Sequence, residues 1–197
     1  MKPFAESCVE NRAPILAVLR EAFAGRRLVL EIGSGTGQHA CYFAPELPFL
    51  TWQTSDRAEN HAGIHAWLAA EGAPNIRPPL VLDVRQRLWP VETADAVFSA
   101  NTAHIMDWDG VTALFAGVGR ILEPDGRFAL YGPFNYGGRY TSDSNARFDA
   151  WLKQRDPASG IRNFEDLQTL AAAAGLELLH DYPMPANNRT LLWRKAG

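Results

Sequence analysis

One nine-residue stretch constrains the fold of this chain most: residues 29–37 read VLEIGSGTG. Its first half is apolar around one acid, Glu31, which is the pattern of a short buried strand. Its second half places Gly33, Gly35 and Gly37 at alternate positions. Glycine weakens a strand and marks a tight turn or a close approach of another group to the backbone. The stretch therefore predicts a strand that ends in a turn approached by a ligand.

Strand-like and helix-like segments alternate along most of the chain. Short apolar runs predict strands at 27–32, 50–54, 80–83, 94–100 and 127–131, with two more near the C-terminus at 176–182 and 190–194. Helical periodicity predicts helices at 14–24, 38–43, 59–71, 111–122, 147–154 and 164–174. Alternation of this kind indicates an α/β fold, in which helices cover both faces of a parallel sheet.

Composition excludes several classes of protein. With 197 residues, 47% of them hydrophobic, the chain predicts one domain spanning 1–197. A net charge of −3, with scattered lysines and arginines, argues against a nucleic-acid partner. No apolar run reaches the roughly 18–20 residues of a membrane span, and the first residues lack the apolar centre of a signal peptide. Two cysteines, Cys8 and Cys41, suit a reduced compartment, so we expect a cytoplasmic protein without a membrane partner.

The residues that follow the five predicted parallel strands have a shared chemical character. Parallel sheets bind ligands at the carboxyl ends of their strands. Asp56 follows the second strand, 19 positions after Gly37, where an acid can accept both hydroxyls of a ribose. Asp83 follows the third, where a carboxylate can accept a hydrogen bond from a purine amine, and the helix start at Gln38 adds a partial positive charge. These features predict a cofactor that contains a nucleoside.

Glycine spacing alone leaves the identity of that nucleoside open. Residues 35–40, GTGQHA, fit the G-x-G-x-x-A fingerprint of dinucleotide sites, so an NAD-binding oxidoreductase is one reading. Three features favour a different cofactor. Glu31 lies on the strand just before the glycines, Asp83 offers a purine contact, and no tyrosine is followed four positions later by a lysine, a common acid–base pair in small Rossmann reductases.

Several segments carry a resemblance to known proteins. The glycine stretch, Asp56, LDV at 82–84 and ILEPDGRFALYGPF at 121–134 resemble the class I S-adenosylmethionine-dependent methyltransferases. SCVENRAPIL, NTAHIMDW, LYGPFNYGGRYTSDSNARFDAWL, GIRNFEDL and AAAAGLEL together resemble the methyltransferase-like protein 26 family over nearly the whole chain. The resemblance implies a Rossmann-like, doubly wound, mostly parallel seven-stranded sheet that ends in a C-terminal antiparallel hairpin. It also implies S-adenosylmethionine as cofactor.

The resemblance also implies roles for particular residues. The N-terminal helix, within 1–24, would cover the cofactor site, and Asn11 or Arg12 would meet the methionine carboxylate. The family motif has Arg-Asn where this chain reads Glu10-Asn11-Arg12. Asp56 would hold the ribose, and Asn101 would lie under the sulfonium. The implied cofactor-binding set is Asn11, Arg12, Glu31, Gly33, Ser34, Gly35, Gly37, Asp56, Arg57, Asp83, Val84 and Asn101.

The acceptor of the methyl group is predicted from the loops after the fourth and fifth strands. His104, three residues past Asn101, has a side chain suited to a general base near neutral pH, and Tyr136 is a second candidate catalytic residue. Aromatic loop residues suit a small organic acceptor, neutral or anionic, with Arg139 as the partner of an anion and glycines 137–138 as hinges. The expected acceptor-binding residues are Trp108, Tyr131, Phe134, Arg139 and Tyr140.

Two further signals are set aside. His61 and His65 are spaced like a zinc pair but lack the intervening glutamate and a third ligand, so we expect no metal. NTAH at 101–104 differs from the Asn/Asp-Pro-Pro-aromatic signature of enzymes that methylate amino groups of DNA bases or glutamine, which again argues against nucleic acid. A protein that binds S-adenosylmethionine without catalysis remains the competing class.

Overall fold

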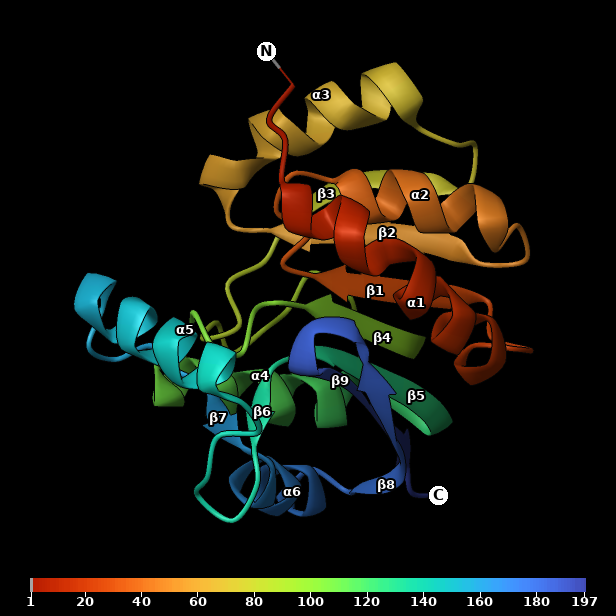
Figure 1. Cartoon of the computed structure of the whole chain (residues 1–197). Helices are drawn as coiled ribbons and strands as arrows, with labels where there is room; N and C mark the ends of the chain where they lie inside the picture. The colour runs from red at the N-terminus through yellow and green to blue at the C-terminus, as the bar shows by residue number, and fades with distance from the viewer. Residues whose placement is uncertain (1) are drawn as a thin grey trace.

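A computed structural model of the chain describes residues 2–197. Its main sheet has seven strands in the order β3-β2-β1-β4-β5-β9-β8 (Figure 1). The first five pair in parallel, β9 runs antiparallel to β5, and β8 runs antiparallel to β9. The strands are β1 (Leu28–Ile32), β2 (Thr51–Asp56), β3 (Ile76–Val81), β4 (Ala94–Ala100), β5 (Leu122–Gly132), β8 (Leu176–Met184) and β9 (Asn188–Lys195). The predicted α/β fold with its C-terminal antiparallel hairpin is confirmed.

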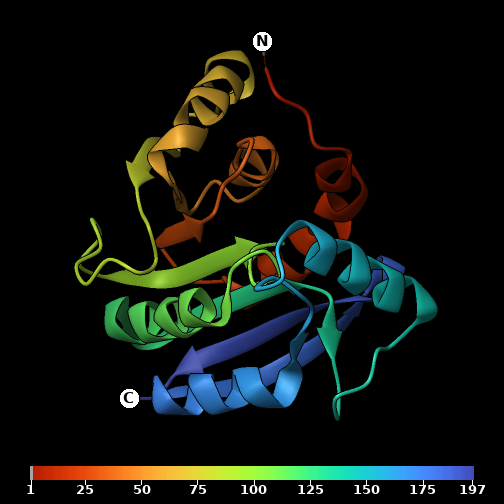
Figure 2. The same cartoon turned by 90° about the vertical axis from the view of Figure 1, so that its left-hand side faces the viewer.

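Helices cover both faces of this sheet. They are α1 (Glu6–Ala22), α2 (Gln38–Glu46), α3 (His61–Glu71), α4 (Trp108–Ile121), α5 (Asp143–Arg155) and α6 (Phe164–Ala173), with short 3-10 turns at Ala58–Asn60 and Pro185–Asn187. In Figure 2, α4 and α6 lie on one side of the sheet, and α1, α2 and α3 lie on the other. Among the described residues, 2–197, no helix combines the length and the apolar character that crossing a membrane requires.

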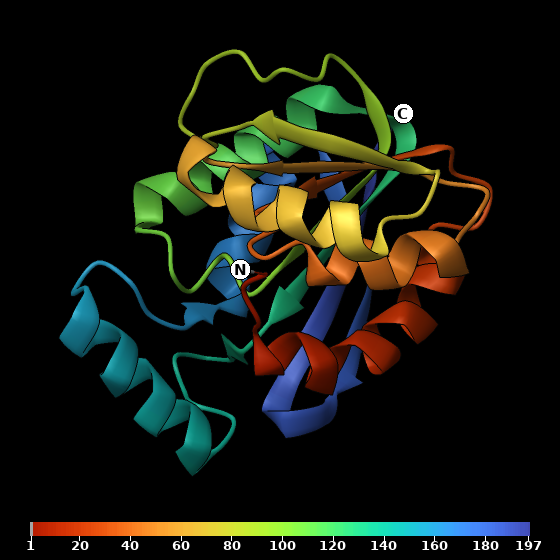
Figure 3. The same cartoon turned by 90° about the horizontal axis from the view of Figure 1, so that it is seen from above.

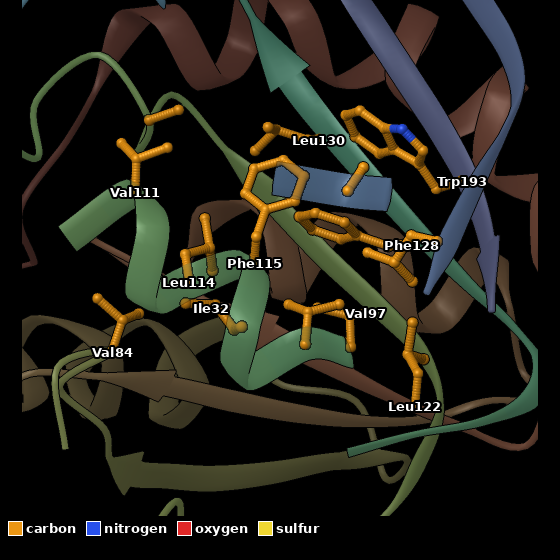
Figure 4. Packing of buried hydrophobic residues seen from close by; sticks show 14 of the residues in the cluster. Ile32, Val84, Val97, Val111, Leu114, Phe115, Leu122, Phe128, Leu130 and Trp193 are labelled. Carbon is orange, nitrogen blue, oxygen red and sulfur yellow. The ribbon is translucent and has the colours of Figure 1, made fainter. Parts of the chain in front are cut away.

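Alternate residues of each central strand belong to two separate hydrophobic cores, because successive side chains point to opposite faces of the sheet. Val29 packs with α1 and α2, whereas Leu30 packs with α4 and α6. On the α4 side, Phe115, Phe128 and Trp193 form one aromatic cluster with ring centroids 5.4–5.5 Å apart (Figure 4). The two cores hold the strand ends, and thus the loops that follow them, in fixed positions.

Several boundaries differ from the sequence prediction, and three of them have a clear physical reason. Helix α1 begins at Glu6 and contains Pro14, because the polar segment 6–12 forms helix without any apolar periodicity to reveal it. Strand β3 begins at Ile76 and includes Pro78 and Pro79, which an edge strand tolerates. The expected turn at 123–126 lies inside β5, where the pairing with β4 shifts register.

The segment between β5 and α6 forms a separate layer beside the strand ends. Two short strands, β6 (Phe134–Asn135) and β7 (Arg162–Asn163), pair in parallel and bracket α5. Figure 3 shows α5 standing away from the seven-stranded sheet, at the same end of the molecule as the start of α1. This layer provides one wall of the second cavity described below.

Candidate functional site

A cavity of about 530 Å³ lies at the carboxyl ends of β1, β2 and β4 and beside the loop after β3. Residues that follow these four strands line it, and Ala5, Ser7 and Cys8 close one side at the start of α1. We call this space the glycine-turn cavity. Its volume lies within the range of about 300–1,000 Å³ that small-molecule sites occupy. The structure thus brings together the strand ends that the sequence singles out.

The three glycines of the turn serve different purposes. A Cβ on Gly33 would lie 2.5 Å from the side chain of Thr102, and one on Gly37 would lie 3.2 Å from the backbone of Ile64. These two glycines therefore permit close packing. Gly35, at φ +57°, has nothing within 4 Å of its Cβ position, and it lines the cavity. Gly33 and Gly35 both line the cavity and Gly37 does not, but only Gly35 has open space at its Cβ position.

Asp56 ends β2 and organises the turn. Its Oδ2 accepts a hydrogen bond from the Gly35 amide at 2.7 Å, and its Oδ1 accepts from the Arg57 amide and from Asn60 at 2.7 and 2.8 Å. A carboxylate offers about four acceptor positions, so one stays available toward the cavity. Asp56 is a buried acid that can still accept a hydrogen bond from a ligand hydroxyl.

Glu31 lies behind the turn, almost fully buried. Its Oε2 accepts from the Ser34 hydroxyl at 2.8 Å and from the Trp52 indole at 3.0 Å. Burial raises the pKa of this carboxyl to about 7, and the two hydrogen bonds counteract the shift. Ser34 lines the cavity and Glu31 does not, so Glu31 acts on the site through Ser34.

Three more residues that line the glycine-turn cavity follow β2 and β3. Arg57 follows β2, and Asp83 and Val84 follow β3. Asp83 Oδ1 accepts from the Arg85 amide at 3.0 Å, and the Arg85 guanidinium donates to Asp107 at 2.6 Å. The backbone amide of Gly110 and the Arg85 side chain hold the pKa of Asp107 below its usual range. The cavity therefore has a partly charge-compensated polar rim opposite the glycine turn.

Asn101 is the one residue of β4's end with unusual backbone geometry. It follows β4 at φ +57°, a left-handed conformation that asparagine adopts more readily than most residues. Its amide donates to the Tyr131 carbonyl at 2.9 Å, which ties the ends of β4 and β5 together. Such conformations concentrate at functional sites, where the surrounding structure enforces them.

A second cavity, of about 540 Å³, adjoins the first. It lies between α1, α5 and the β8–β9 connection, and we call it the α5 cavity. Ser7, Asn101 and Ile105 line both cavities. The two spaces therefore meet at the end of β4, with Asn101 between them.

His104 lies in the α5 cavity, as the sequence prediction for a base requires. The side chain is buried, and its ring packs edge-on against Phe148 at 5.3 Å. Burial, and to a smaller extent the nearby Arg162 cation, lower the pKa of His104 to about 4. The imidazole is thus neutral at neutral pH and can accept a proton.

A buried chain of side chains connects the two cavities. His39, which lines the glycine-turn cavity, contacts Asn11 Oδ1 through Nε2 at 2.7 Å. An amide oxygen only accepts, so His39 carries its proton on Nε2. Asn11 also hydrogen-bonds to Tyr131, and both line the α5 cavity. Burial lowers the pKa of His39 to about 4 and raises that of Tyr131 to about 12, so both groups are neutral at neutral pH.

Several predicted site residues lie at neither cavity. Arg12 packs over the Tyr42 ring at 4.4 Å. Phe134 is 1% exposed and belongs to the core on the α4 side. Trp108 begins α4, with its indole near Arg162.

The loop after β5 also differs from expectation. The Tyr136 hydroxyl donates to Asp181 at 2.7 Å, and Tyr140 donates to Asp149 at 2.6 Å. Arg139 pairs with Tyr136 through the backbone at the tip of the loop. The Gly137 amide donates to Glu165 at 2.9 Å, which fixes this loop to α6. The two tyrosine hydroxyls of this loop therefore contact residues of the fold itself. Of the expected acceptor-binding residues, only Tyr131 lines a cavity.

Other lining residues escape the sequence pattern. Asn60 and Arg85 follow the two strand-end acids at short spacing, four residues after Asp56 and two after Asp83, and that spacing is a usable signal. Phe148 and Trp151, which line the α5 cavity, are three positions apart on one face of α5. That face is indistinguishable in sequence from an ordinary core-facing stripe.

The family described as "Protein of unknown function (DUF938)" matches residues 2–195. The chain belongs to the DUF938 family. Its fold is also similar to that of solved methyltransferases.

Three solved structures resemble this DUF938 chain closely in fold. An O-methyltransferase family protein from Burkholderia thailandensis has a TM-score of 0.84 at 16% identity, covering 98% of this chain and 58% of its own. An O-methyltransferase family 2 protein from Planctomyces limnophilus, in complex with apigenin, has a TM-score of 0.84 at 19% identity, covering 96% and 58%. Human N-acetylserotonin methyltransferase, in complex with S-adenosylmethionine, has a TM-score of 0.81 at 16% identity, covering 98% and 53%. The DUF938 chain spans a little over half the length of each.

Proposed function

We propose that this DUF938 protein is an S-adenosylmethionine-dependent methyltransferase that acts on a small molecule. The observation that carries the proposal is the meeting of two cavities at Asn101, one lined by the glycine turn and strand-end acids and the other by aromatic side chains. The similarity in fold to methyltransferases, one of them holding S-adenosylmethionine, supports it. The narrower relationship to the methyltransferase-like protein 26 family stays a prediction, as does a cytoplasmic location.

The residues of the glycine-turn cavity fit the proposed cofactor. Gly35 leaves open space beside the turn, and Asp56 retains an acceptor position for a ribose hydroxyl. Asp83 and Val84 would contact the adenine edge, with Arg57 flanking it. Arg12 lies outside this cavity and Asn11 lies in the other, so neither enters our proposal as a partner of the methionine carboxylate.

The chain's own contribution to the reaction is mainly alignment. When bound, S-adenosylmethionine supplies a methyl group on a sulfonium, which is already a good leaving group. The two cavities would hold donor and acceptor in contact, and well-oriented reactants gain about 7–11 kcal/mol in effective molarity. Neutral His104 would take the proton from the acceptor, and because the structural neighbours include O-methyltransferases, we propose a hydroxyl as the group methylated.

Calorimetry with S-adenosylmethionine, S-adenosylhomocysteine and NAD tests the cofactor. We expect both S-adenosyl compounds to bind and NAD to bind more weakly. Tighter binding of NAD would instead support the oxidoreductase reading that residues 35–40 permit. A screen of metabolite extracts with methyl-labelled cofactor then separates an enzyme from a protein that only binds S-adenosylmethionine, because only an enzyme transfers the label.

A further inference from the structure

The α5 cavity has an aromatic wall that runs outward from the strand ends. His104 packs against Phe148 at 5.3 Å, and Phe148 stacks on Trp151 at 5.8 Å with an angle of 18° between the rings. All three side chains line the cavity. Trp151 is 47% exposed, so much of this wall is open to contact from a bound molecule.

Among the described residues that line the α5 cavity, the only formal charge is negative. Glu10, an exposed residue of α1, lines it, and its charge contributes to the raised pKa of Tyr131. Within residues 2–197, the side chain of Glu10 has no hydrogen bond or ion pair, and no lysine or arginine is among the lining residues. Two cations lie close to the aromatic wall without lining the cavity: Arg155 packs over Trp151 at 4.6 Å, and Arg162 is near enough to His104 to lower its pKa. Arg12 packs over Tyr42.

We propose that the α5 cavity takes a flat acceptor that carries a positively charged amine. The amine would lie against Glu10 and the aromatic wall, because carboxylates and ring faces both attract ammonium groups. The hydroxyl to be methylated would point inward to His104 and Asn101, where the two cavities meet. The proposed acceptor differs from the neutral or anionic one expected from the sequence, because Arg139 does not line this cavity. This inference rests on the proposed function for the identity of the neighbouring cofactor.

Three phenols test the inference: tyramine, 4-ethylphenol and 3-(4-hydroxyphenyl)propanoate, which share a para two-carbon side chain and differ in its terminal group, an ammonium, a hydrogen and a carboxylate. Binding is measured by calorimetry on the full chain saturated with S-adenosylhomocysteine. We expect tyramine to bind about tenfold more tightly than the propanoate, with 4-ethylphenol between them. Equal affinities, the reverse order, or no binding of any phenol at millimolar concentration would overturn the proposal.

Two variants test whether Glu10 causes the preference for tyramine. Glu10→Gln is expected to reduce the tyramine preference about threefold to tenfold, whereas Glu6→Gln, an exposed acid one turn earlier on α1 and outside the cavity, leaves it unchanged. A preference that survives Glu10→Gln contradicts the assignment. A titration with S-adenosylhomocysteine alone tests the proposed cofactor, and absence of binding would refute it. The three phenols are also titrated without S-adenosylhomocysteine, so that the charge preference of the cavity is measured independently of the cofactor.

Discussion

Asp56 Oδ2 accepts a hydrogen bond from the backbone amide of Gly35 at 2.7 Å. The acid at the end of β2 thereby fixes the turn at the end of the neighbouring β1. The same carboxylate lines the glycine-turn cavity and keeps one acceptor position toward it. Asp56 therefore shapes the glycine turn, and in our proposal it also holds the ribose of the cofactor.

Replacing Asp56 tests whether its carboxylate is needed to bind the cofactor. We expect Asp56→Ala to weaken binding of S-adenosylhomocysteine by about 1.5–3 kcal/mol, the range for hydrogen bonds that involve a charged group. Asp56→Asn keeps one acceptor oxygen and is expected to lose less. Calorimetry measures both, with Asp109→Ala, an exposed acid outside the cavity, as the control. Normal binding by Asp56→Ala would mean that the ribose lies elsewhere.

Gly35 and Gly25 form a matched pair for the second prediction. Both have positive φ, +57° and +75°, and neither has any atom within 4 Å of its Cβ position, but only Gly35 lines the cavity. Valine at either site is expected to lower the free energy of unfolding by about 1–2 kcal/mol, the cost of a left-handed residue with a side chain. Only Gly35→Val is expected to abolish binding of S-adenosylhomocysteine. Equal loss of binding in Gly25→Val would show that destabilisation, and not cavity space, is responsible.

The fold is predictable from the sequence because its signals are local. The apolar runs that become β1, β2, β4 and β5 are short, buried on both faces and bounded by turn residues, which leaves few alternative readings. Edge strand β3 is less well predicted, since its prolines argue against a strand unless its place at the sheet edge is known. The first two turns of α1 are missed because segment 6–12 has almost no apolar stripe.

The site residues are predictable from the sequence only where they lie at the end of a strand or directly after it. Asp56 is the last residue of β2, and Asp83 and Asn101 follow β3 and β4 within two residues, so parallel pairing brings them together. The loop after β5 is longer, and its polar groups find partners within the fold, such as Tyr136 with Asp181. The spacing of residues in the sequence does not predict those hydrogen-bond partners. The aromatic wall of the α5 cavity is likewise set by tertiary packing.

The buried carboxyl of Glu31 predicts an unusual pH dependence of stability. Its pKa is raised from 4.5 to about 7 in the folded protein. Below about pH 4.5 both folded and unfolded states carry the proton, so its contribution to stability is complete there. As pH rises toward 7, the unfolded state releases the proton first, and the free energy of unfolding falls by about 3 kcal/mol.

Glu31→Gln tests this effect, because glutamine keeps an oxygen for Ser34 and Trp52 but does not titrate. Denaturant unfolding is measured for the variant and the native protein between about pH 4 and pH 8. We expect the variant to gain stability relative to the native protein as pH rises, by about 3 kcal/mol in total. The lowered pKa values of His39 and His104 make stability rise with pH. This effect is the same in the variant and the native protein, so it cancels when their free energies of unfolding are subtracted. Exposed Glu92→Gln serves as control, and parallel curves for Glu31→Gln would contradict the raised pKa.

His104 is the last test, once an acceptor is known. As a general base it is expected to account for about 100-fold or more in kcat, so His104→Ala should lose that factor while affinity for S-adenosylhomocysteine stays unchanged. Because burial and Arg162 lower its pKa to about 4, kcat/KM should stay flat down to about pH 5 and fall only near pH 4. Arg162→Gln removes the nearby cation and is expected to move that fall to higher pH.

Two controls accompany this experiment. His65→Ala changes an exposed histidine of α3, and Arg139→Ala changes the loop-tip arginine that lies outside both cavities; neither is expected to alter kcat or KM. Full activity of His104→Ala would show that alignment alone carries the reaction. A fall in kcat/KM near pH 6.5 that Arg162→Gln does not move would assign the titrating group elsewhere, because the burial and charge that act on His104 place its titration well below that value.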